Sequence, residues 1–294
     1  MLTQISRLIT ALFYRLTSPQ YRAINESGLF DHKQYLDDNP DVNASGIDPL
    51  AHYLRKGHAE HRNPGALFNH GYYIHQISEQ NYNGENLLLH FLEEGRDEGI
   101  KPNILIDPEY YSLMNPDFDS SKMDPLAHFL QKDTASKSPN PPSPYFDPYF
   151  YCNKYADAKR HINDPKAAYV HYLRVGLKEN RQPSVYFDPA YYLEKYSLLD
   201  VIGHSSLSHY IMFGSTANKS PSALFDPLYY AIKYDVSDSE DLFAHYLRNT
   251  LREDRQPCSW FNPEFYRHSY LLEVKEPVLP LKHFLEIGLK NHYY

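Results

Sequence analysis

Hydrophobic and polar positions follow one another in the same order along most of this chain. A large apolar residue followed by Asp or Asn recurs at intervals of 36 to 41 residues. The seven anchors are Phe30-Asp31, Phe68-Asn69, Ile106-Asp107, Phe146-Asp147, Phe187-Asp188, Phe225-Asp226 and Phe261-Asn262. A period of this length is the signature of a tandem repeat. We therefore predict seven copies of one structural repeat, beginning near residues 30, 68, 106, 146, 187, 225 and 261.

Three further positions recur within the repeats. A tyrosine follows every anchor by five residues, at Tyr35, Tyr73, Tyr111, Tyr151, Tyr192, Tyr230 and Tyr266. A histidine follows 20 to 25 residues after the anchor, at His52, His90, His128, His171, His209, His245 and His283. Glycine stands five residues after the histidine in five repeats, at Gly57, Gly95, Gly176, Gly214 and Gly288. We expect this glycine to close a helix in the left-handed conformation.

Helix-starting Asp-Pro pairs predict two short helices in each repeat. Asp before Pro, as in Asp188-Pro189, favours a helix start, because the side chain caps free N–H groups and Pro fits the first position. A second start, such as Asp48-Pro49, leads into the segment with the histidine. Helices of two or three turns are unstable alone and must pack on neighbours. We predict an all-α fold, a tandem helix-turn-helix array over residues 29–294 that is either α-solenoid-like or more compact.

Residues 1–28 are predicted to form an amphipathic helix and a linker in front of the repeats. Apolar residues recur there at steps of three and four, which makes one stripe on a helix. They are Leu2, Ile5, Leu8, Ile9, Leu12, Phe13 and Leu16. The other face carries Arg7 and Arg15, and no acidic residue precedes Glu26. The helix could cap the first repeat or contact a membrane surface.

Six repeats carry a second aromatic residue directly before the recurring tyrosine. This aromatic row consists of Tyr72, Tyr110, Phe150, Tyr191, Tyr229 and Phe265. Adjacent residues of a helix point about 100° apart, so only one member of each pair can face the core fully. The row therefore either packs between repeats or lines a groove that could stack on sugar rings or on a partner's side chains.

The sequence favours a non-catalytic protein without metal or cofactor. Packed helices lie about 8–10 Å apart, so equivalent histidines cannot share one metal ion. We expect each imidazole to pack inside its repeat, bonded to a backbone or Asp oxygen. Asp117-Phe118-Asp119 resembles the cation-binding triplet of sugar-nucleotide transferases, but it aligns with the loop Asp41-Val42-Asn43 of the first repeat. We therefore interpret it as a loop.

Charge and cysteine content restrict the partners and the compartment. The net charge is −8, and no basic block accompanies it, which disfavours nucleic acid as a partner. Cys152 and Cys258 are too far apart in sequence to indicate a disulfide framework or a metal site. The sequence contains no run of 18 apolar residues and therefore predicts no membrane-spanning helix. We expect a cytoplasmic protein, peripheral at the inner membrane if its first helix binds there. Its last repeat is expected to dock on a partner, on a second copy, or on a catalytic domain that this chain lacks.

The repeat itself resembles a known bacterial sequence family. The resemblance rests on motifs such as Asn39-Pro40-Asp41-Val42 and Asp48-Pro49-Leu50-Ala51-His52-Tyr53, and it covers the chain from about residue 28 onward. Similar repeats flank the catalytic domains of large glycosyltransferases, including rhamnan-synthesis-type proteins, and occur in some calcium-binding secreted proteins. This chain has neither a transferase domain nor nonapeptide calcium repeats.

The resemblance implies a scaffold or interaction protein associated with the synthesis of a bacterial surface polysaccharide, O-antigen or capsule. Glycosyltransferases would then be its protein partners. Two alternatives remain open at this stage: a glycan-binding module that uses the aromatic row, and a glycosyltransferase or an accessory subunit of one.

Overall fold

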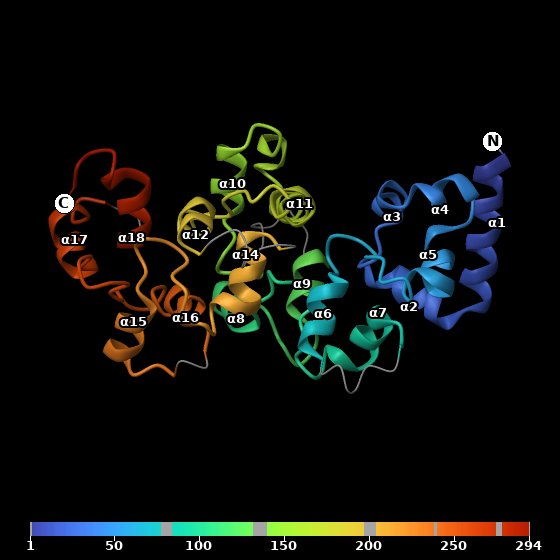
Figure 1. Ribbon diagram of the computed structural model, residues 1–294, viewed down its shortest axis with the longest axis horizontal. Coiled ribbons are helices and arrows are strands. Elements are labelled where there is room, and N and C mark those ends of the chain that lie inside the picture. The colour runs from blue at the N-terminus through green and yellow to red at the C-terminus, as the bar shows by residue number, and fades with distance from the viewer. Residues whose placement is uncertain are drawn as a thin grey trace. The chain divides into compact units, whose positions relative to one another are not determined.

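The structure of the protein is a computed structural model that describes residues 2–77, 84–131, 140–196, 204–237, 240–274 and 278–293. These residues contain 17 α-helices and no β-strand. Helix pairs started by proline follow one another at regular intervals (Figure 1). The predicted all-helical repeat array is confirmed.

Each repeat contributes a first and a second helix. The first helices are α3 (His32–Asp38), α6 (His70–Gln76), α8 (Pro108–Met114), α10 (Pro148–Lys154), α12 (Pro189–Lys195), α15 (Pro227–Tyr234) and α17 (Pro263–Tyr270). The second helices are α5 (Pro49–His52), α7 (Leu87–His90), α9 (Pro125–Gln131), α11 (Pro165–His171), α14 (Ser206–His209), α16 (Leu242–Asn249) and α18 (Pro280–His283).

Shorter and preceding elements complete the chain. In five repeats the second helix continues into a π-helical turn, namely η1 (Tyr53–Gly57), η3 (Phe91–Gly95), η5 (Tyr172–Gly176), η6 (Tyr210–Gly214) and η7 (Phe284–Gly288). Helices α1 (Leu2–Thr17) and α2 (Pro19–Ser27) precede the repeats. Helix α4 (Pro40–Ser45) lies in the first repeat and the 3-10 turn η4 (Lys159–His161) in the fourth.

The anchor Asp or Asn caps the first helix in all seven repeats, as the sequence predicts. Its side-chain oxygen accepts a backbone N–H of the first turn at 2.8–3.1 Å. In the first six repeats the backbone N–H of the same residue donates to a proline carbonyl in the loop that follows the second helix. These prolines are Pro64, Pro102, Pro142, Pro183, Pro221 and Pro257. One residue thus starts the helix and closes the repeat.

Loss of a cap has a predictable cost. We expect Asp188→Ala to lower the free energy of unfolding by about 1 kcal/mol, because the carboxylate accepts two N–H groups at the start of α12. The exposed Glu194 on the same helix provides the control, and Glu194→Ala should change the value by less than about 0.5 kcal/mol. Denaturant titration of both variants measures this. Equal effects would contradict the capping role.

Aromatic rings fill the core of each repeat. The apolar anchor side chains and the recurring tyrosines are all buried. A third aromatic residue, directly after the histidine, packs edge-on against the tyrosine at 83–89° in six repeats. These residues are Tyr53, Phe91, Tyr172, Tyr210, Tyr246 and Phe284. Edge-to-face pairs add about 0.5–1.5 kcal/mol to the burial of their area. This position also recurs in the sequence, and our sequence analysis missed it.

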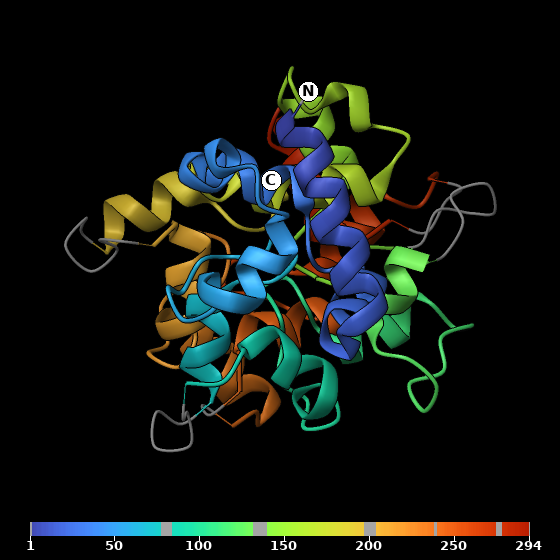
Figure 2. The same ribbon diagram turned by 90° about the vertical axis from the view of Figure 1, so that its right-hand side faces the viewer.

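The chain divides into two compact units. The N-terminal unit comprises Met1–Ile106 and Ser121–Gln131, and the C-terminal unit comprises Asp107–Ser120 and Lys132–Tyr294. The two helices of the third repeat, α8 and α9, therefore belong to different units. In the N-terminal unit, α2 contacts α5 and α7, and Arg96 pairs with Asp124 at 2.9 Å in front of α9. Figure 2 shows the dark-blue helix α1 beside the lighter-blue helices of the first repeat, where it contacts α5.

In the C-terminal unit, repeats that are three apart in sequence touch one another. Arg248 of α16 pairs with Asp107 and Glu109 beside α8, at 2.7 and 3.1 Å. Lys282 of α18 pairs with Asp147 in front of α10, at 2.7 Å. Contacts in this unit are thus not limited to neighbouring repeats, as they would be in an open solenoid.

Candidate binding site

The recurring histidine is bonded to the recurring tyrosine of its own repeat. In six repeats the tyrosine hydroxyl lies 2.7–3.0 Å from the histidine Nδ1. The imidazoles are therefore internal to the repeat, as expected. Their partner differs from the expected backbone or Asp oxygen, because the two short helices bring the hydroxyl of the first to the imidazole of the second.

The recurring glycine completes this pair, and its predicted left-handed conformation is wrong. None of the five glycines has a positive φ. Each ends a π-helical turn, in which the following N–H bonds five residues back at 2.8–3.0 Å. A Cβ built on Gly57 or Gly95 would lie 2.0 Å from the tyrosine hydroxyl oxygen of its repeat. Glycine is required because the hydroxyl occupies the space of a side chain.

The left-handed position lies four residues beyond this glycine. It is occupied by His61, Gly99, Asn180, Asn218 and His292. Asn and His tolerate this conformation better than most residues. The sixth repeat lacks the glycine, and its second helix α16 remains α-helical to Asn249.

Burial favours the uncharged forms of the tyrosine and the histidine in the first and fourth repeats. Desolvation raises the pKa of Tyr35 and Tyr151 and lowers the pKa of His52 and His171. The nearby guanidinium of Arg181 lowers the pKa of His171 further, and Arg181 itself pairs with Asp157 at 2.8 Å. A neutral histidine that accepts from a tyrosine is a structural group, not a proton donor at neutral pH.

The other residues that the sequence offers as catalytic or metal-binding candidates do not form a site. Within the described residues, no group of three or more His, Cys, Asp or Glu side chains could hold a metal ion. Asp117 and Asp119 are exposed, and the ring of Phe118 between them packs on Tyr111. Cys152 and Cys258 are buried free thiols whose pKa is raised by burial.

The six members of the aromatic row have different surroundings. Tyr72 is buried, Phe265 is 59% exposed, and the other four are intermediate. Lysine Nζ atoms lie over three of the rings, Lys154 over Phe150, Lys195 over Tyr191 and Lys233 over Tyr229, at 5.1–5.5 Å. The six rings of the aromatic row therefore do not form one uniform exposed surface. Three of them make cation–π contacts with a lysine of their own helix.

The same three repeats share a second tyrosine at the end of the first helix. Tyr155, Tyr196 and Tyr234 accept a loop N–H at 2.6–2.8 Å through their hydroxyls. Arg181, Lys219 and Arg255 lie over these rings at 4.7–4.8 Å. These contacts fix the loop against the first helix. They explain why a basic residue stands two positions before the loop proline in each of these repeats.

One member of the row, Tyr110, lines a cavity of about 390 Å³ in the C-terminal unit. The cavity lies where four repeats meet. Its walls include Tyr110 of α8, Pro144 and Tyr149 around the start of α10, Tyr186 before α12, Leu247 of α16 and Lys282 of α18. Small-molecule sites commonly measure about 300–1,000 Å³ and combine apolar walls with a few polar groups. This cavity has both properties.

Lys282 of the seventh repeat and Asp147 and Tyr186 of the fourth are among the polar residues that line the cavity. Lys282 Nζ lies 2.7 Å from Asp147 Oδ2; burial lowers the pKa of Lys282, but the Asp147 and Glu286 carboxylates together raise it above its usual value. The hydroxyl of Tyr186 is buried and has no hydrogen-bond partner in the described part of the chain. Burial raises its pKa, so the hydroxyl remains protonated. An unpartnered buried hydroxyl costs about 1–3 kcal/mol.

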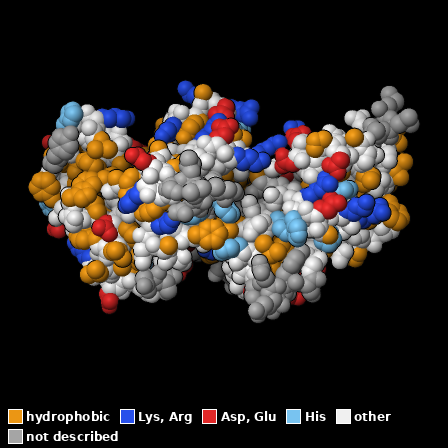
Figure 3. All heavy atoms as spheres, viewed as in Figure 1, with side chains coloured by type: hydrophobic (Ala, Val, Ile, Leu, Met, Phe, Trp, Pro, Cys, Tyr) orange, Lys and Arg blue, Asp and Glu red, His pale blue; other side chains and the backbone are white. Residues whose placement is uncertain are grey.

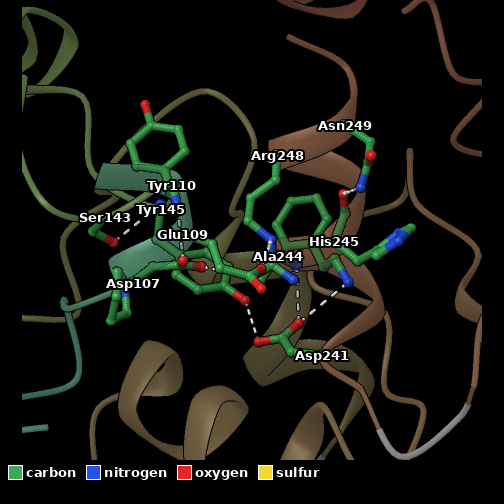
Figure 4. A network of polar contacts seen from close by, with 12 residues as sticks. Asp107, Glu109, Tyr110, Ser143, Tyr145, Asp241, Ala244, His245, Arg248 and Asn249 are labelled. Atoms are coloured by element: carbon green, nitrogen blue, oxygen red, sulfur yellow. Dashed lines mark hydrogen bonds and ion pairs between the residues drawn. The ribbon is translucent and has the colours of Figure 1, made fainter. Parts of the chain in front are cut away.

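A buried polar network supports the wall formed by α16 (Figure 4). Asp241 caps α16 by accepting the N–H of Ala244 at 3.0 Å, and its carboxylate also accepts the hydroxyl of Tyr145. Arg248 on the same helix reaches Asp107 and Glu109. Burial raises the pKa of Asp241. The network fixes α16, which contributes Leu247 to the cavity wall, against the third repeat.

The apolar stripe of α1 faces outward. Ile5, Leu8, Ile9, Leu12, Phe13 and Leu16 are 48–72% exposed. Figure 3 shows hydrophobic side chains along the edge formed by α1. The opposite face packs on the first repeat, where Arg7 donates to the Asn43 side chain at 2.8 Å, and on α2, where Tyr14 stacks on Tyr21. Arg15 is exposed, and the side chain of Leu2 lies outside the described residues.

Helix α1 therefore does not bury its apolar stripe against the first repeat. Within the described residues, no helix is both long and apolar enough to cross a lipid bilayer. In the last repeat, Ile287 and Leu289 are 42% and 46% exposed.

Fold and site together define the class of an all-helical tandem-repeat protein with an internal tyrosine–histidine bond. Comparison with family models, with curated proteins and with solved structures found no match in any of the three.

Proposed function

We propose that this chain is a non-catalytic scaffold that works at the inner face of the bacterial cytoplasmic membrane, where surface polysaccharide is assembled. The observation that carries the proposal is the outward apolar stripe of α1, whose opposite face contacts the first repeat through Arg7. Contiguous exposed apolar patches commonly mark interaction sites. The link to polysaccharide synthesis rests on the resemblance of the repeats.

The chemistry of α1 fits a lipid surface. Residues 1–25 contain no acidic side chain, and the exposed Arg15 lies in the last turn of the helix. Arg7 is engaged with Asn43 and holds the helix in place, so the apolar side chains would supply most of the binding. Burying six such side chains in a membrane interface offers on the order of 5 kcal/mol or more.

Vesicle binding tests this proposal. The triple variant Leu8→Gln/Leu12→Gln/Leu16→Gln is expected to co-sediment at least about tenfold less with vesicles of phosphatidylethanolamine and anionic phosphatidylglycerol, because three apolar side chains are lost. The matched control is Leu228→Gln/Ile232→Gln/Leu272→Gln, whose parent side chains are 59–84% exposed on the C-terminal unit. The control should pellet like the wild type. Equal pelleting of the two triple variants would remove the membrane role.

The polysaccharide role needs its own experiment. Deleting the gene in the producing bacterium should shorten or abolish its surface polysaccharide on gels. The wild-type gene should restore the polysaccharide, and the α1 triple variant should not. A normal polysaccharide in the deletion strain would contradict this part of the proposal and leave the vesicle result standing.

A further inference from the structure

The residue directly before each anchor shows how the repeats of the C-terminal unit pack on one another. Before the fourth anchor this residue is Tyr145, whose ring centroid lies 6.2 Å from that of Tyr210 in the fifth repeat and 5.8 Å from that of Phe243 in the sixth. Before the fifth anchor it is Tyr186, which lines the cavity together with residues of the sixth and seventh repeats. The position is thus covered by repeats further along the chain.

Trp260 occupies the same position before the seventh anchor and is 58% exposed. Its counterparts Leu29, Leu105 and Tyr145 are at most 5% exposed, and the remaining three are intermediate. Phe265 of the aromatic row differs from its counterparts in the same way, because it is exposed and they are buried or intermediate. The last anchor and its first helix therefore present a surface on which other repeats pack elsewhere in the chain.

Further apolar side chains extend this surface. Leu272 after α17 and Ile287 and Leu289 around the end of η7 are 42–74% exposed. Figure 3 shows hydrophobic side chains gathered over α17 and α18. We call Trp260, Phe265, Leu272, Ile287 and Leu289 the Trp260 surface. We propose that the Trp260 surface binds the same surface of a second copy, so that the chain forms a two-fold symmetric dimer. The inference goes beyond the scaffold function and does not depend on α1.

The interior of the chain shows what kind of group covers such a position. Tyr145 is covered by rings from the second helical segments of later repeats, namely Tyr210 of η6 and Phe243 of α16. The Trp260 surface contains both kinds of group that this contact needs, since it has exposed rings and exposed aliphatic side chains on the second helical segment. Trp and Phe are also enriched in protein–protein interfaces. A second copy therefore brings matching groups.

The two ends of the chain are not equivalent as binding partners for this surface. The second helix of the first repeat, α5, contacts α1 and α2, so the first repeat of another copy is already covered where a following repeat would pack. Head-to-tail contact would also continue from copy to copy into a filament, whereas two identical surfaces close on each other. These points favour the symmetric contact.

The charges of the seventh repeat are compatible with a contact between two copies. The chain as a whole carries a net charge of −8, but Glu264, Glu273 and Lys290 of this repeat are exposed and include both signs. A two-fold arrangement can bring Lys290 of each copy to a carboxylate of the other, whereas two purely acidic surfaces would repel.

Fluorescence of the full chain reports directly on the proposed contact, because Trp260 is its only tryptophan. Raising the protein concentration from about 0.1 to about 100 µM should shift the emission to shorter wavelength and reduce quenching by acrylamide, because the indole leaves water. Sedimentation equilibrium over the same range should show the mass rising to twice the 34.4 kDa of one chain.

Exposed substitutions separate this contact from other apolar surfaces. Ile287→Gln/Leu289→Gln keeps the fluorescent reporter and should raise the Kd of the dimer at least about tenfold. The matched control Leu228→Gln/Ile232→Gln replaces two side chains of α15 that are 59% and 84% exposed, and it should associate like the wild type. The α1 triple variant should also associate like the wild type.

Four results would overturn the dimer. A monomeric mass at every concentration would leave the Trp260 surface to a different protein, and a mass that grows beyond two chains would indicate head-to-tail contact. A dimer with unchanged tryptophan emission, or one that is lost in the α1 triple variant and kept in Ile287→Gln/Leu289→Gln, would place the contact elsewhere. Vesicle binding is measured through α1, so the two proposals fail independently.

Discussion

Replacing Gly95 by alanine is expected to destabilise the N-terminal unit by about 3–5 kcal/mol. The new Cβ would lie 2.0 Å from the Tyr73 hydroxyl oxygen and 3.2 Å from His90 Nδ1. Tyr73 is fully buried between the two helices of its repeat and cannot move aside without breaking its 2.7 Å bond to His90. Overpacking costs about 1–3 kcal/mol, and an unpaired buried polar group costs about as much again. Denaturant titration of the full chain measures the loss.

Two further variants establish the cause. Gly71 lies on α6 of the same repeat, where a Cβ would meet nothing closer than 3.6 Å. Gly71→Ala should therefore stabilise the helix by up to about 1 kcal/mol. Removing the obstructing hydroxyl in Gly95→Ala/Tyr73→Phe should recover part of the stability lost in Gly95→Ala. If the double variant is as unstable as the sum of the single variants, the close approach is not the reason for the glycine.

Acid is expected to destabilise the protein as the pH falls from about 6.5 to about 4. His70 is buried beside His61, and desolvation followed by the His61 charge lowers its pKa to about 4. In the unfolded chain a histidine titrates near about 6.5. The unfolded state therefore takes up the proton first as the pH falls. The stability from neutral His70, on the order of 2–3 kcal/mol, is present above about pH 6.5 and disappears as the pH falls to about 4.

The repeat histidines act in the same direction. Burial also lowers the pKa of His52, His171, His245 and His283. Unfolding free energies at pH 7.5 and pH 5 measure the combined effect. In His70→Gln the difference between the two pH values should shrink by about 1–2 kcal/mol. His75→Gln replaces an exposed histidine on the same helix and should leave it unchanged. If the difference in unfolding free energy between pH 7.5 and pH 5 is the same in His70→Gln as in the wild type, His70 is not a source of the acid sensitivity.

Local interactions were predictable from the sequence because they join neighbours in the chain. The anchor Asp and the N–H that it caps are three residues apart, as in Asp31 and Gln34, so the residue types alone indicate the bond. The period of the repeat and the all-helical class follow from the same local pattern.

Contacts between helices were not predictable in the same way. Tyr35 and His52 are 17 residues apart, and whether they meet depends on the angle between two helices. The glycine was misassigned for this reason, since a glycine near a helix end usually indicates a left-handed cap. The cavity was missed because Asp147 and Lys282, 135 residues apart, meet only through the rotation from one repeat to the next.

The tautomer of the repeat histidines tests most directly whether they are structural. A tyrosine hydroxyl that donates to Nδ1 of a neutral histidine leaves the proton on Nε2. Long-range ¹H–¹⁵N spectra of histidine-labelled protein should therefore place the ring proton of His52, His90, His171, His209, His245 and His283 on Nε2. Imidazolium signals or protonated Nδ1 atoms at these positions would contradict the tyrosine–histidine bond on which the fold of each repeat depends.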